Sequence, residues 1–334
     1  MAIHVSIIIP AYNEQAFIRR CLDSLIGNDF RKDALEILVF DGKSTDGTFG
    51  IVEEYTQKYP FIKLFTNPDR VSVKALNQGI RQAQGEILMR CDTHCEYPPI
   101  YVRELVGPLE RGEADNVGGT IETLPSNDTP SGVAIAAALN HPFGVGLSFR
   151  TRKFGRTPVE VDTVPFGSWK KTTFEKVGLY DEQFVRAQDF DHNIRLRKAG
   201  GKILLLPHVV TKYFARNTLK KLARMAYQYG YAKTQIIKKH RLLGNKRQIF
   251  PALFVLGLPL TLLVPGLAWG YALYLCVALL VGLWIGVKNR SIPVAVIVPA
   301  AFFVMHTWYG VGYLKGLVDN FLLGRATVTW EATR

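Results

Sequence analysis

An acid and a histidine, Asp92 and His94, stand one residue apart at the end of the apolar run 86–91, which has the composition of a β-strand. A carboxylate and an imidazole at a strand's exit can hold one divalent cation, and that cation can neutralise the diphosphate of a bound nucleotide. Imidazole suits Mn²⁺ better than Mg²⁺, which prefers oxygen ligands. We therefore expect Asp92 and His94 to bind Mn²⁺ or Mg²⁺. The alternative is a histidine that hydrogen-bonds substrate or backbone and binds no metal.

Cys91 and Cys95 flank the same pair, so a zinc site that includes His94 is a competing interpretation. No fourth ligand stands at the spacing of a zinc finger, and Cys91 is one of the alternating side chains of the predicted strand. We therefore do not favour zinc. The four cysteines are few and scattered, which is typical of a reduced compartment. The apolar start at 5–9 lacks a basic stretch before it and stops at Pro10, so we expect no secretory signal and a cytosolic N-terminal part.

A second carboxylate, Asp189, begins a predicted helix at 189–199 and lies in the sequence Gln-Asp-Phe-Asp at 188–191. A carboxylate at that place can remove the proton of an attacking hydroxyl, which makes Asp189 the candidate general base. Asp191 and Arg195 are expected to orient the site. The alternative for Asp189 is capping of the helix N-terminus.

Gly167 and Trp169, which precede this helix in the sequence, complete the acceptor side of the predicted site. Gly167 offers a backbone turn, and Trp169 offers an aromatic face that can stack on a sugar ring. We therefore expect Gly167 and Trp169 to support the binding of an acceptor.

Nucleotide ligands are expected in the first quarter of the chain. Asp41 follows an apolar strand and can accept a hydrogen bond from a base or a ribose, and Lys74 can reach a diphosphate as a point charge. The alternatives are that Asp41 stabilises a turn and that Lys74 is a solvated helix lysine. Asp46 or Thr45 can cap the helix that follows.

These residues depend on elements that bring distant segments together. Apolar runs alternate with helical periodicity through the first ninety residues, and this βαβα order predicts a mostly parallel sheet with helices on both faces. Ligands bind at the carboxyl ends of such strands, where Asp41 and Asp92 both fall. The predicted strands are 5–9, 35–40, 61–65 and 86–91, and the predicted helices are 15–26, 45–59 and 73–84.

The chain is less regular after this point. A strand is predicted at 116–122, and residues 123–163 are then expected to be loop-rich, because they include several Pro, Gly and basic residues. Two short strands, 202–206 and 209–214, are expected on either side of Pro207.

Charge is divided unevenly along the chain. Residues 1–211 carry 25 Lys and Arg against 26 Asp and Glu, a net charge of −1, whereas residues 212–334 carry 16 against 2, a net charge of +14. The basic segment borders long apolar runs and is not interleaved with base-stacking aromatics, so we expect anionic membrane lipid as its partner and no nucleic acid. A basic amphipathic helix predicted at 217–240 suits the membrane interface, the alternative being an ordinary amphipathic helix on the globular domain.

Residues 249–287 contain no charge, which is nearly enough for two bilayer crossings of ~20 residues each. We expect apolar segments near 249–264, 268–287 and 292–314, of which the first is short and could be re-entrant. Basic residues on both sides of the first two segments place those flanks in the cytosol. The topology of the third segment stays open.

The expected domains follow from these patterns. Residues 1–215 form the catalytic domain, 216–248 a basic interface segment, 249–320 a transmembrane region and 321–334 a tail. The protein is then a multi-pass protein of the cytoplasmic (inner) membrane with a cytosolic catalytic domain. Its oligomeric state is left open.

Taken together, the motifs resemble the family 2 inverting glycosyltransferases of the GT-A fold. The resemblance covers about residues 3–240 by motif, and with the Asp-x-His box and the C-terminal apolar segments it is closest to bacterial succinoglycan-type exopolysaccharide glucosyltransferases. The motifs are Pro10-Ala11-Tyr12-Asn13-Glu14, Asp41 with Ser44-Thr45-Asp46-Gly47-Thr48, Ala75-Leu76-Asn77-Gln78-Gly79, Gly85-Glu86 and Asp92-Thr93-His94.

The resemblance implies roles for individual residues. Asp92 and His94 serve the metal and the diphosphate, and Asp189 is the base. Gln188 departs from the family, where an acid is usual, and the Gln-x-x-Arg-Trp box of processive synthases is absent, which favours addition of a single sugar. The implied nucleotide-sugar ligands are Pro10, Ala11, Tyr12, Glu14, Asp41, Lys74 and Asp92.

The function implied is transfer of a hexose, with glucose expected, from a UDP-sugar to a polyprenyl-diphosphate-linked glycan at the cytosolic membrane face, in exopolysaccharide or related surface-glycan synthesis. The alternatives are transfer to polyprenyl phosphate itself, a processive synthase, and a non-catalytic membrane assembly partner with a decayed nucleotide site. A dinucleotide-binding oxidoreductase is not favoured, because no Gly-x-Gly-x-x-Gly follows the first strand.

Overall fold

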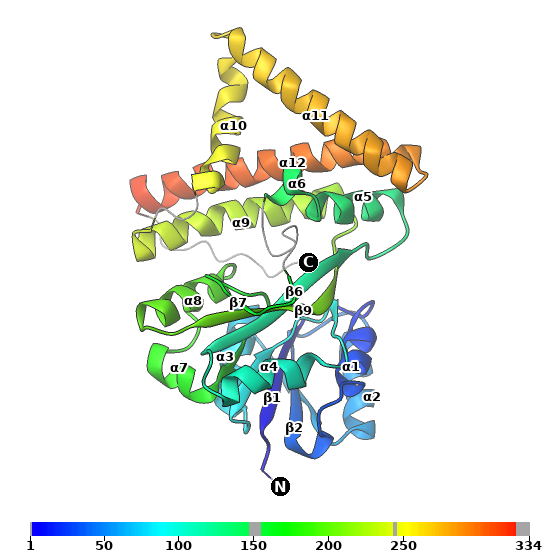
Figure 1. Cartoon of the computed structure of the whole chain (residues 1–334), viewed down its shortest axis with the longest axis vertical. Coiled ribbons are helices and arrows are strands. Elements are labelled where there is room, and N and C mark those ends of the chain that lie inside the picture. The colour runs from blue at the N-terminus through cyan, green and yellow to red at the C-terminus, as the bar shows by residue number, and fades with distance from the viewer. Residues whose placement is uncertain (1, 147–154, 243–245, 325–334) are drawn as a thin grey trace. The chain divides into compact units, whose positions relative to one another are not determined.

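The structure is a computed structural model that describes residues 2–146, 155–242 and 246–324 and contains two compact units (Figure 1). Within the described residues, the sheet unit comprises 2–122 and 155–213, and the helical unit comprises 123–146, 214–242 and 246–324. The expected tail falls largely on 325–334, which lies outside the described residues.

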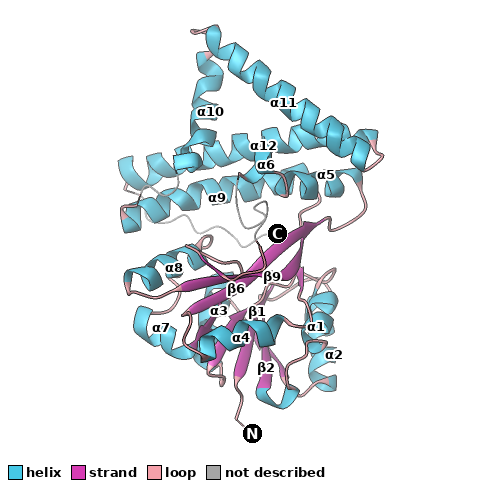
Figure 2. Ribbon diagram, viewed as in Figure 1, coloured by secondary structure: helices cyan, strands magenta, loops and turns pink. Residues whose placement is uncertain are grey.

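A nine-stranded sheet forms the centre of the sheet unit, in the order β3-β2-β1-β4-β8-β6-β9-β5, with β7 paired to β9 (Figure 2). The pairs among β1 to β4 are parallel, whereas β4 pairs antiparallel with β8. The sheet is therefore mixed. The expectation of a mostly parallel sheet holds for β1 to β4 alone, because the regular alternation of strand and helix ends after β4. The strands are β1 (Val5–Ala11), β2 (Leu35–Asp41), β3 (Ile62–Thr66), β4 (Ile87–Arg90), β5 (Cys95–Glu96), β6 (Asn116–Leu124), β7 (Val159–Glu160), β8 (Ser168–Lys170) and β9 (Ile203–Phe214).

Helices flank this sheet. α3 packs against β1 and β2, α2 against β2 and β3, and α4 against β8. The helices of the sheet unit are α1 (Ile18–Ile26), α2 (Thr48–Lys58), α3 (Ser72–Gln82), α4 (Tyr101–Glu110), α7 (Lys171–Val177) and α8 (Gln188–Lys198), with a 3₁₀ turn at Lys32–Ala34.

Strand β2 is buried at every position, which explains its apolar sequence and singles out its one internal acid, Glu36. The Glu36 carboxylate accepts hydrogen bonds from Ser6 Oγ (2.6 Å), Gln84 N (2.7 Å) and Lys63 Nζ (2.8 Å). Burial opposes its ionisation, but these donors outweigh burial and lower the pKa of Glu36. The buried charge of Glu36, on the strand next to the β3 edge, is thus partnered on both of its oxygens.

Two expectations about local structure are wrong. The two strands expected around Pro207 are one strand, β9, because a proline lacks only the N–H and its carbonyl still accepts a hydrogen bond from Thr120 Oγ1 (3.2 Å). The loop expected at 123–163 contains α5 (Pro130–Leu139) and α6 (Pro142–Val145). Thr129 caps α5 by accepting from Gly132 N, and Pro130 occupies the first turn, where its missing N–H costs nothing.

The helical unit brings α5 and α6 together with the C-terminal helices. α12 packs along α9 and also contacts α5, α10 and α11 (Figure 1). Its remaining elements are α9 (Leu219–His240), a 3₁₀ turn (Lys246–Ile249), α10 (Phe250–Leu260), α11 (Gly266–Lys288), α12 (Ile292–Leu317) and a π-helical turn (Val318–Leu322).

Glycines allow α9 and α12 to approach closely. A Cβ on Gly230 would lie 2.1 Å from the carbonyl oxygen of Tyr309, and a Cβ on Gly312 would lie 2.1 Å from that of Tyr227. The amphipathic helix expected at 217–240 is therefore present, but the central part of its apolar stripe packs against α12 instead of facing lipid.

Among the residues that the structure describes, two helices are long and apolar enough to cross a membrane, Gly266–Lys288 and Ile292–Leu322. The first expected segment, 249–264, holds only the 11-residue helix α10, which spans about 16 Å of an approximately 30 Å hydrocarbon core. Apolar side chains where α10 turns into α11 are highly exposed: Leu262 is 86%, Leu263 78% and Trp269 80% exposed.

Candidate active site

The donor side of the site is built from the carboxyl ends of β1 and β2. Ala11 and Asp41 are register partners at these ends, and Gly42 N donates to Ala11 O (2.8 Å). Asp41 is 2% exposed; its Oδ2 accepts from Ser44 N (3.0 Å), while its Oδ1 has no partner among the described residues. Because a buried oxygen without a donor costs about 1–3 kcal/mol, Asp41 Oδ1 is placed to accept a hydrogen bond from a ligand.

The loops after these two strands hold each other in place. Asn13, in a left-handed conformation (φ 53°), donates its backbone N–H to Ser44 Oγ (2.9 Å) and accepts from Thr45 N through Oδ1 (2.8 Å). Asp46 accepts from Gln15 N (3.1 Å) and from Thr48 N at the start of α2 (2.9 Å). The N-cap of α2 is Gly47, so Asp46 lies one residue before it, where its carboxylate accepts from the first N–H of the helix and also ties the two loops together.

The other expected nucleotide ligands differ in their surroundings. Pro10 is half-buried at the end of β1, and the ring of Tyr12 carries the guanidinium of Arg70 at 5.7 Å. Lys74 Nζ forms an ion pair with Asp69 (3.0 Å), and the two side chains are 40% and 50% exposed. This pair agrees with the solvated-lysine alternative, and the diphosphate role of Lys74 stays a prediction.

His94, one of the two expected metal ligands, lies between Glu14 of the donor loops and Tyr213 of β9. Glu14 is 6% exposed, and its Oε1 lies 3.6 Å from Nδ1 of His94, whose ring meets Tyr213 edge-on at 4.9 Å. The turn after β4 is fixed by Tyr97, whose hydroxyl accepts from Asp92 N (2.7 Å). Across the described ranges, no three His, Cys, Asp or Glu residues converge to hold a metal ion. The donor set fits a cation held by Asp92 and His94 with its other positions left to a diphosphate.

Arg90 connects the donor side to the acceptor side. Its Nε lies 3.2 Å from Asp92 Oδ1 and its Nη2 3.3 Å from Asp92 Oδ2, while its Nη1 lies 3.6 Å from Asp189 Oδ2. Burial opposes the charge of Arg90, but Asp92 and Asp189 outweigh burial and raise its pKa. The sequence reasoning missed this residue, although a lone cation at the end of the apolar strand 87–90 was a usable signal.

Asp189 is the second residue of α8, and the capping position is Ala187, which has a left-handed backbone (φ 61°). Within the described part of the chain, Asp189 Oδ1 accepts from the adjacent Phe190 N alone (2.8 Å), and its side chain is 36% exposed. The capping alternative therefore fails for Asp189, because the helix begins before it.

Asp191 and Arg195 anchor α8, and their expected role in orienting the site stays a prediction. Asp191 is fully buried and accepts from Arg195 Nε (3.1 Å). Arg195 also donates to the carbonyl oxygens of Leu179 (2.7 Å) and Val177, which ties α8 to the turn after α7.

Trp169 corrects an expectation. It is 2% exposed and packs edge-on against Phe174 (5.5 Å), His192 (5.7 Å) and Tyr180 (6.2 Å), so its face is not open to a sugar. An aromatic residue in a short strand beside a glycine has the same sequence pattern whether it lines a site or fills a core. Trp169 fills the core.

Gly167 has a packing role beside Trp169. A Cβ there would lie 2.4 Å from Asn116 Oδ1 and 2.5 Å from a ring carbon of Trp169. Its carbonyl oxygen accepts from Arg90 N (3.2 Å). Gly167 thus fixes the strand that carries Arg90.

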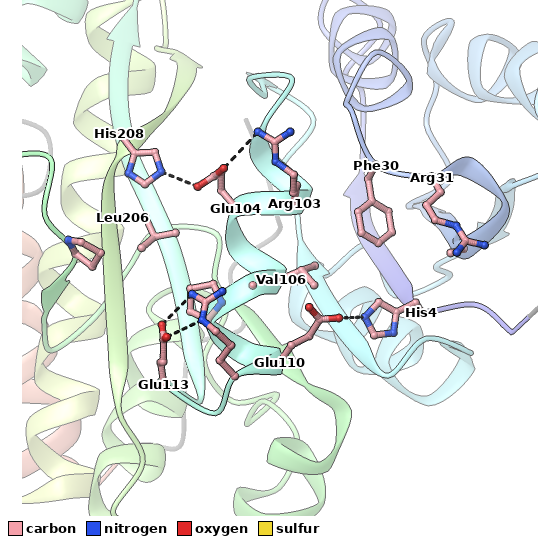
Figure 3. Close-up of a pocket in the computed structure, with 15 residues that line it drawn as sticks. His4, Phe30, Arg31, Arg103, Glu104, Val106, Glu110, Glu113, Leu206 and His208 are labelled. Atoms are coloured by element: carbon pink, nitrogen blue, oxygen red, sulfur yellow. Dashed lines mark hydrogen bonds and ion pairs between the residues drawn. The ribbon is translucent and has the colours of Figure 1, made fainter.

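A hollow of about 630 Å³ lies elsewhere in the sheet unit, beside the residue that precedes β1 (Figure 3). Its walls carry the pairs His4–Glu110 and His208–Glu104, each at 2.9 Å, and Arg103 beside Glu104. None of the expected site residues lines it. Because the candidate site lies at the opposite, carboxyl ends of the parallel strands, this hollow is separate from it.

The comparison with protein families decides the family. The profile of Glycosyl transferase family 2 matches residues 6–177. The chain belongs to glycosyltransferase family 2. This glycosyltransferase is also 31% identical, over 95% of its length and 98% of the relative's, to the dolichyl N-acetyl-α-D-glucosaminyl phosphate 3-β-D-2,3-diacetamido-2,3-dideoxy-β-D-glucuronosyltransferase of Methanococcus voltae.

Two further similarities extend over nearly the whole glycosyltransferase. It is 28% identical to the succinoglycan biosynthesis protein ExoA of Rhizobium meliloti, over 94% of each chain. Its structure is similar to the mannosyltransferase PcManGT of Pyrobaculum calidifontis in complex with GDP-Man and Mn²⁺, with a TM-score of 0.60, 20% identity, and coverage of 96% of this chain and 88% of the other. The expected GT-A fold is thereby confirmed.

Proposed function

We propose that this glycosyltransferase moves a hexose from a UDP-sugar to a polyprenyl-diphosphate-linked glycan, with inversion at the anomeric carbon, at the cytosolic face of a membrane. One observation carries the proposal: the guanidinium of Arg90 contacts both Asp92 and Asp189. The carboxylate expected at the donor diphosphate and the carboxylate expected to act as base therefore belong to one site.

Asp189 performs the proton transfer in this scheme. Its partly exposed carboxylate takes the proton of an acceptor hydroxyl as the oxygen attacks the anomeric carbon, and the bond to the nucleoside diphosphate breaks on the opposite face. Attack from that side inverts the configuration. Asp41 meanwhile accepts a hydrogen bond from the nucleoside through its free Oδ1 and so holds the donor at the sheet edge.

Asp92 and His94 would hold the divalent cation, which when bound neutralises charge on the diphosphate leaving group. The Mn²⁺ in the PcManGT complex supports metal use, and the imidazole of His94 favours Mn²⁺ over Mg²⁺. His94→Asp should shift the metal preference of UDP binding from Mn²⁺ towards Mg²⁺, whereas Asp92→Ala should abolish metal-dependent UDP binding. An unchanged metal profile in His94→Asp would remove His94 from the metal site.

The relatives support a lipid-linked acceptor. The name of the Methanococcus voltae relative describes transfer to a dolichyl-linked N-acetylglucosaminyl phosphate, and ExoA is named for succinoglycan biosynthesis. The first name also makes uronic acid derivatives a donor class to test beside glucose.

For attachment, we propose that the α10–α11 hairpin enters the bilayer. Its turn carries the highly exposed Leu262, Leu263 and Trp269. α12 packs along α9, which exposes Lys220, Lys221 and other basic residues, so carrying the pair across the bilayer would bring several charges into hydrocarbon. This favours α9 and α12 lying along the surface over the multi-pass arrangement expected from the sequence.

The exposed Cys276 of α11 tests this attachment, because the other three cysteines are buried. In membranes, Cys276 should resist a water-soluble maleimide and should react after detergent is added. Rapid labelling of Cys276 in intact membranes would contradict insertion of the hairpin.

The reaction is tested with the detergent-solubilised full chain, a panel of nucleotide sugars, a lipid-linked oligosaccharide acceptor and a metal panel. We expect acceptor-dependent release of UDP from one donor, and a product whose anomeric configuration is opposite to that of the donor. Retention of configuration, or absence of transfer with every donor, would contradict the proposal. Transfer to polyprenyl phosphate alone would favour the alternative acceptor.

A further inference from the structure

We infer that Arg90 is a positioning residue: it holds the Asp189 carboxylate in place for the acceptor and does not bind the donor itself. The inference rests on the proposed function and adds to it a residue that no motif assigns. It concerns how two carboxylates from distant parts of the chain are kept at a fixed separation.

The guanidinium is engaged on two sides. Nε and Nη2 form a two-point contact with Asp92, and Nη1 faces Asp189 at 3.6 Å. A planar guanidinium in a two-point contact fixes the orientation of its remaining N–H groups, so Nη1 is directed by Asp92. These contacts leave Arg90 little capacity to bind a diphosphate as well.

The backbone of Arg90 is equally constrained. Arg90 ends β4, where its N–H donates to Gly167 O (3.2 Å), and its side chain is only 14% exposed. Gly167 has no room for a Cβ, so the strand opposite is fixed too. The sheet therefore holds the guanidinium of Arg90 in place, and the guanidinium in turn holds the carboxylate of Asp189.

Asp189 needs this support. Among the described residues, its polar contacts are with Phe190 N, on its own helix, and with Arg90, which alone comes from another element. Without Arg90, a side chain that is 36% exposed is free to change rotamer, and the negative charges of Asp92 and Asp189 repel each other without a cation between them. A displacement of about 1 Å in a reacting group can cost 10²-fold in rate.

The test compares Arg90→Met and Arg90→Lys with Arg103→Met. Arg103 is a matched control, because it also joins two carboxylates, Asp29 at 2.6 Å and Glu104 at 3.4 Å, but on the rim of the separate hollow (Figure 3). The measurements are kcat, KM for the donor, and the Kd of UDP with Mn²⁺ and with EDTA. Thermal unfolding shows which variants fold.

We expect Arg90→Met to lower kcat about 10²-fold, the scale of losing a well-placed base, while the Kd of UDP changes less than about 3-fold in either buffer. Arg90→Lys should recover about 10-fold of that loss, because a lysine restores the positive charge but not the planar, two-point contact of the guanidinium. Adding Asp189→Asn to Arg90→Met should cost less than about 3-fold more, because the two residues act as a unit. Arg103→Met should stay within about 2-fold of the wild type.

Three results would overturn the inference: wild-type kcat in Arg90→Met, a loss of UDP affinity of 10-fold or more, or a full multiplicative loss in the double variant. The second would make Arg90 a donor ligand. If Arg90→Met does not fold, Arg90→Lys is judged by the same criteria. A wild-type protein that transfers from no donor refutes the proposed function, whereas an active wild type with an equally active Arg90→Met refutes only this inference.

Discussion

The donor half and the acceptor half of the sheet unit hold their side chains by different means. In the donor half, Ala11 and Asp41 are neighbours because β1 and β2 are parallel and in register. The loops that follow are joined by hydrogen bonds from backbone N–H groups to the side chains of Ser44 and Asn13. In the acceptor half, the polar contact that Asp189 makes outside its own helix, among the described residues, is with Arg90, a side chain from β4. The donor site is therefore fixed by strand order, and the acceptor site by a few buried side chains whose loss should affect catalysis and stability separately.

The strongest test of this contrast is Trp169→Ala. Removing a fully buried tryptophan should destabilise the protein by about 3–5 kcal/mol, and Trp169→Phe should cost much less. Urea unfolding of both variants measures the difference, with KM for the acceptor measured on Trp169→Phe. A raised acceptor KM with unchanged stability would restore the sugar-stacking role that the structure argues against.

In the donor half, Asp41→Asn should weaken UDP binding without lowering stability. The hydrogen bond that Asp41 Oδ1 offers is charge-assisted and worth about 1.5–3 kcal/mol, so the Kd of UDP should rise about 10- to 100-fold. Isothermal titration of UDP gives the Kd, and thermal unfolding serves as the control. Unchanged UDP affinity would leave Asp41 a turn residue only.

The acceptor half should also respond to pH through His192. Burial, assisted by Arg195, lowers the pKa of His192 to about 3, against about 6.5 when unfolded. Between pH 6.5 and pH 3, His192 therefore carries a proton in the unfolded chain but not in the folded protein. The contribution of neutral His192 to the free energy of unfolding is fully present above about pH 6.5, and it falls by up to about 1.4 kcal/mol per pH unit towards pH 3.

His192→Phe should remove this slope, and the difference in unfolding free energy between wild type and variant at pH 7, 6, 5 and 4 measures it. A constant difference over that range would show that His192 does not titrate on unfolding.

The smallest effect is expected for Lys74→Ala. Lys74 is paired with Asp69 at an exposed site, and such pairs contribute about 0–1 kcal/mol. The Kd of UDP should change less than about 3-fold. A 10-fold loss of UDP affinity would show that Lys74 binds the diphosphate. The donor half would then also depend on a side chain that reaches the ligand from a helix.

The sequence could predict the donor half because its signals are local. Apolar runs, turn residues and alternating helices fix a parallel sheet, and the carboxyl ends of neighbouring strands meet whatever the remainder of the chain does. This placed Asp41 at the sheet edge correctly and recovered the family, the GT-A fold and the C-terminal apolar helices.

The acceptor half could not be predicted in the same way, because its contacts join distant segments. Nothing near Arg90 in the sequence marks Asp189 as its partner, and the composition around Trp169 does not distinguish a core from a sugar platform. Residues 130–139 have the small apolar residues of a helix, but their loop-like flanks concealed it. The apolar stripe at 217–240 predicted an amphipathic helix correctly, but it was expected to face lipid, and nothing in the local sequence showed that α12 would cover it.

The central claim is that Asp189 is the base of a site that Asp92 and Arg90 complete, and Asp189→Asn tests it most directly. The measurement pairs the Kd of UDP with the rate of transfer to a lipid-linked acceptor in the same preparation. We expect UDP affinity within about 3-fold of wild type and a loss of transfer of at least ~10²-fold. Near-wild-type turnover in Asp189→Asn would contradict it.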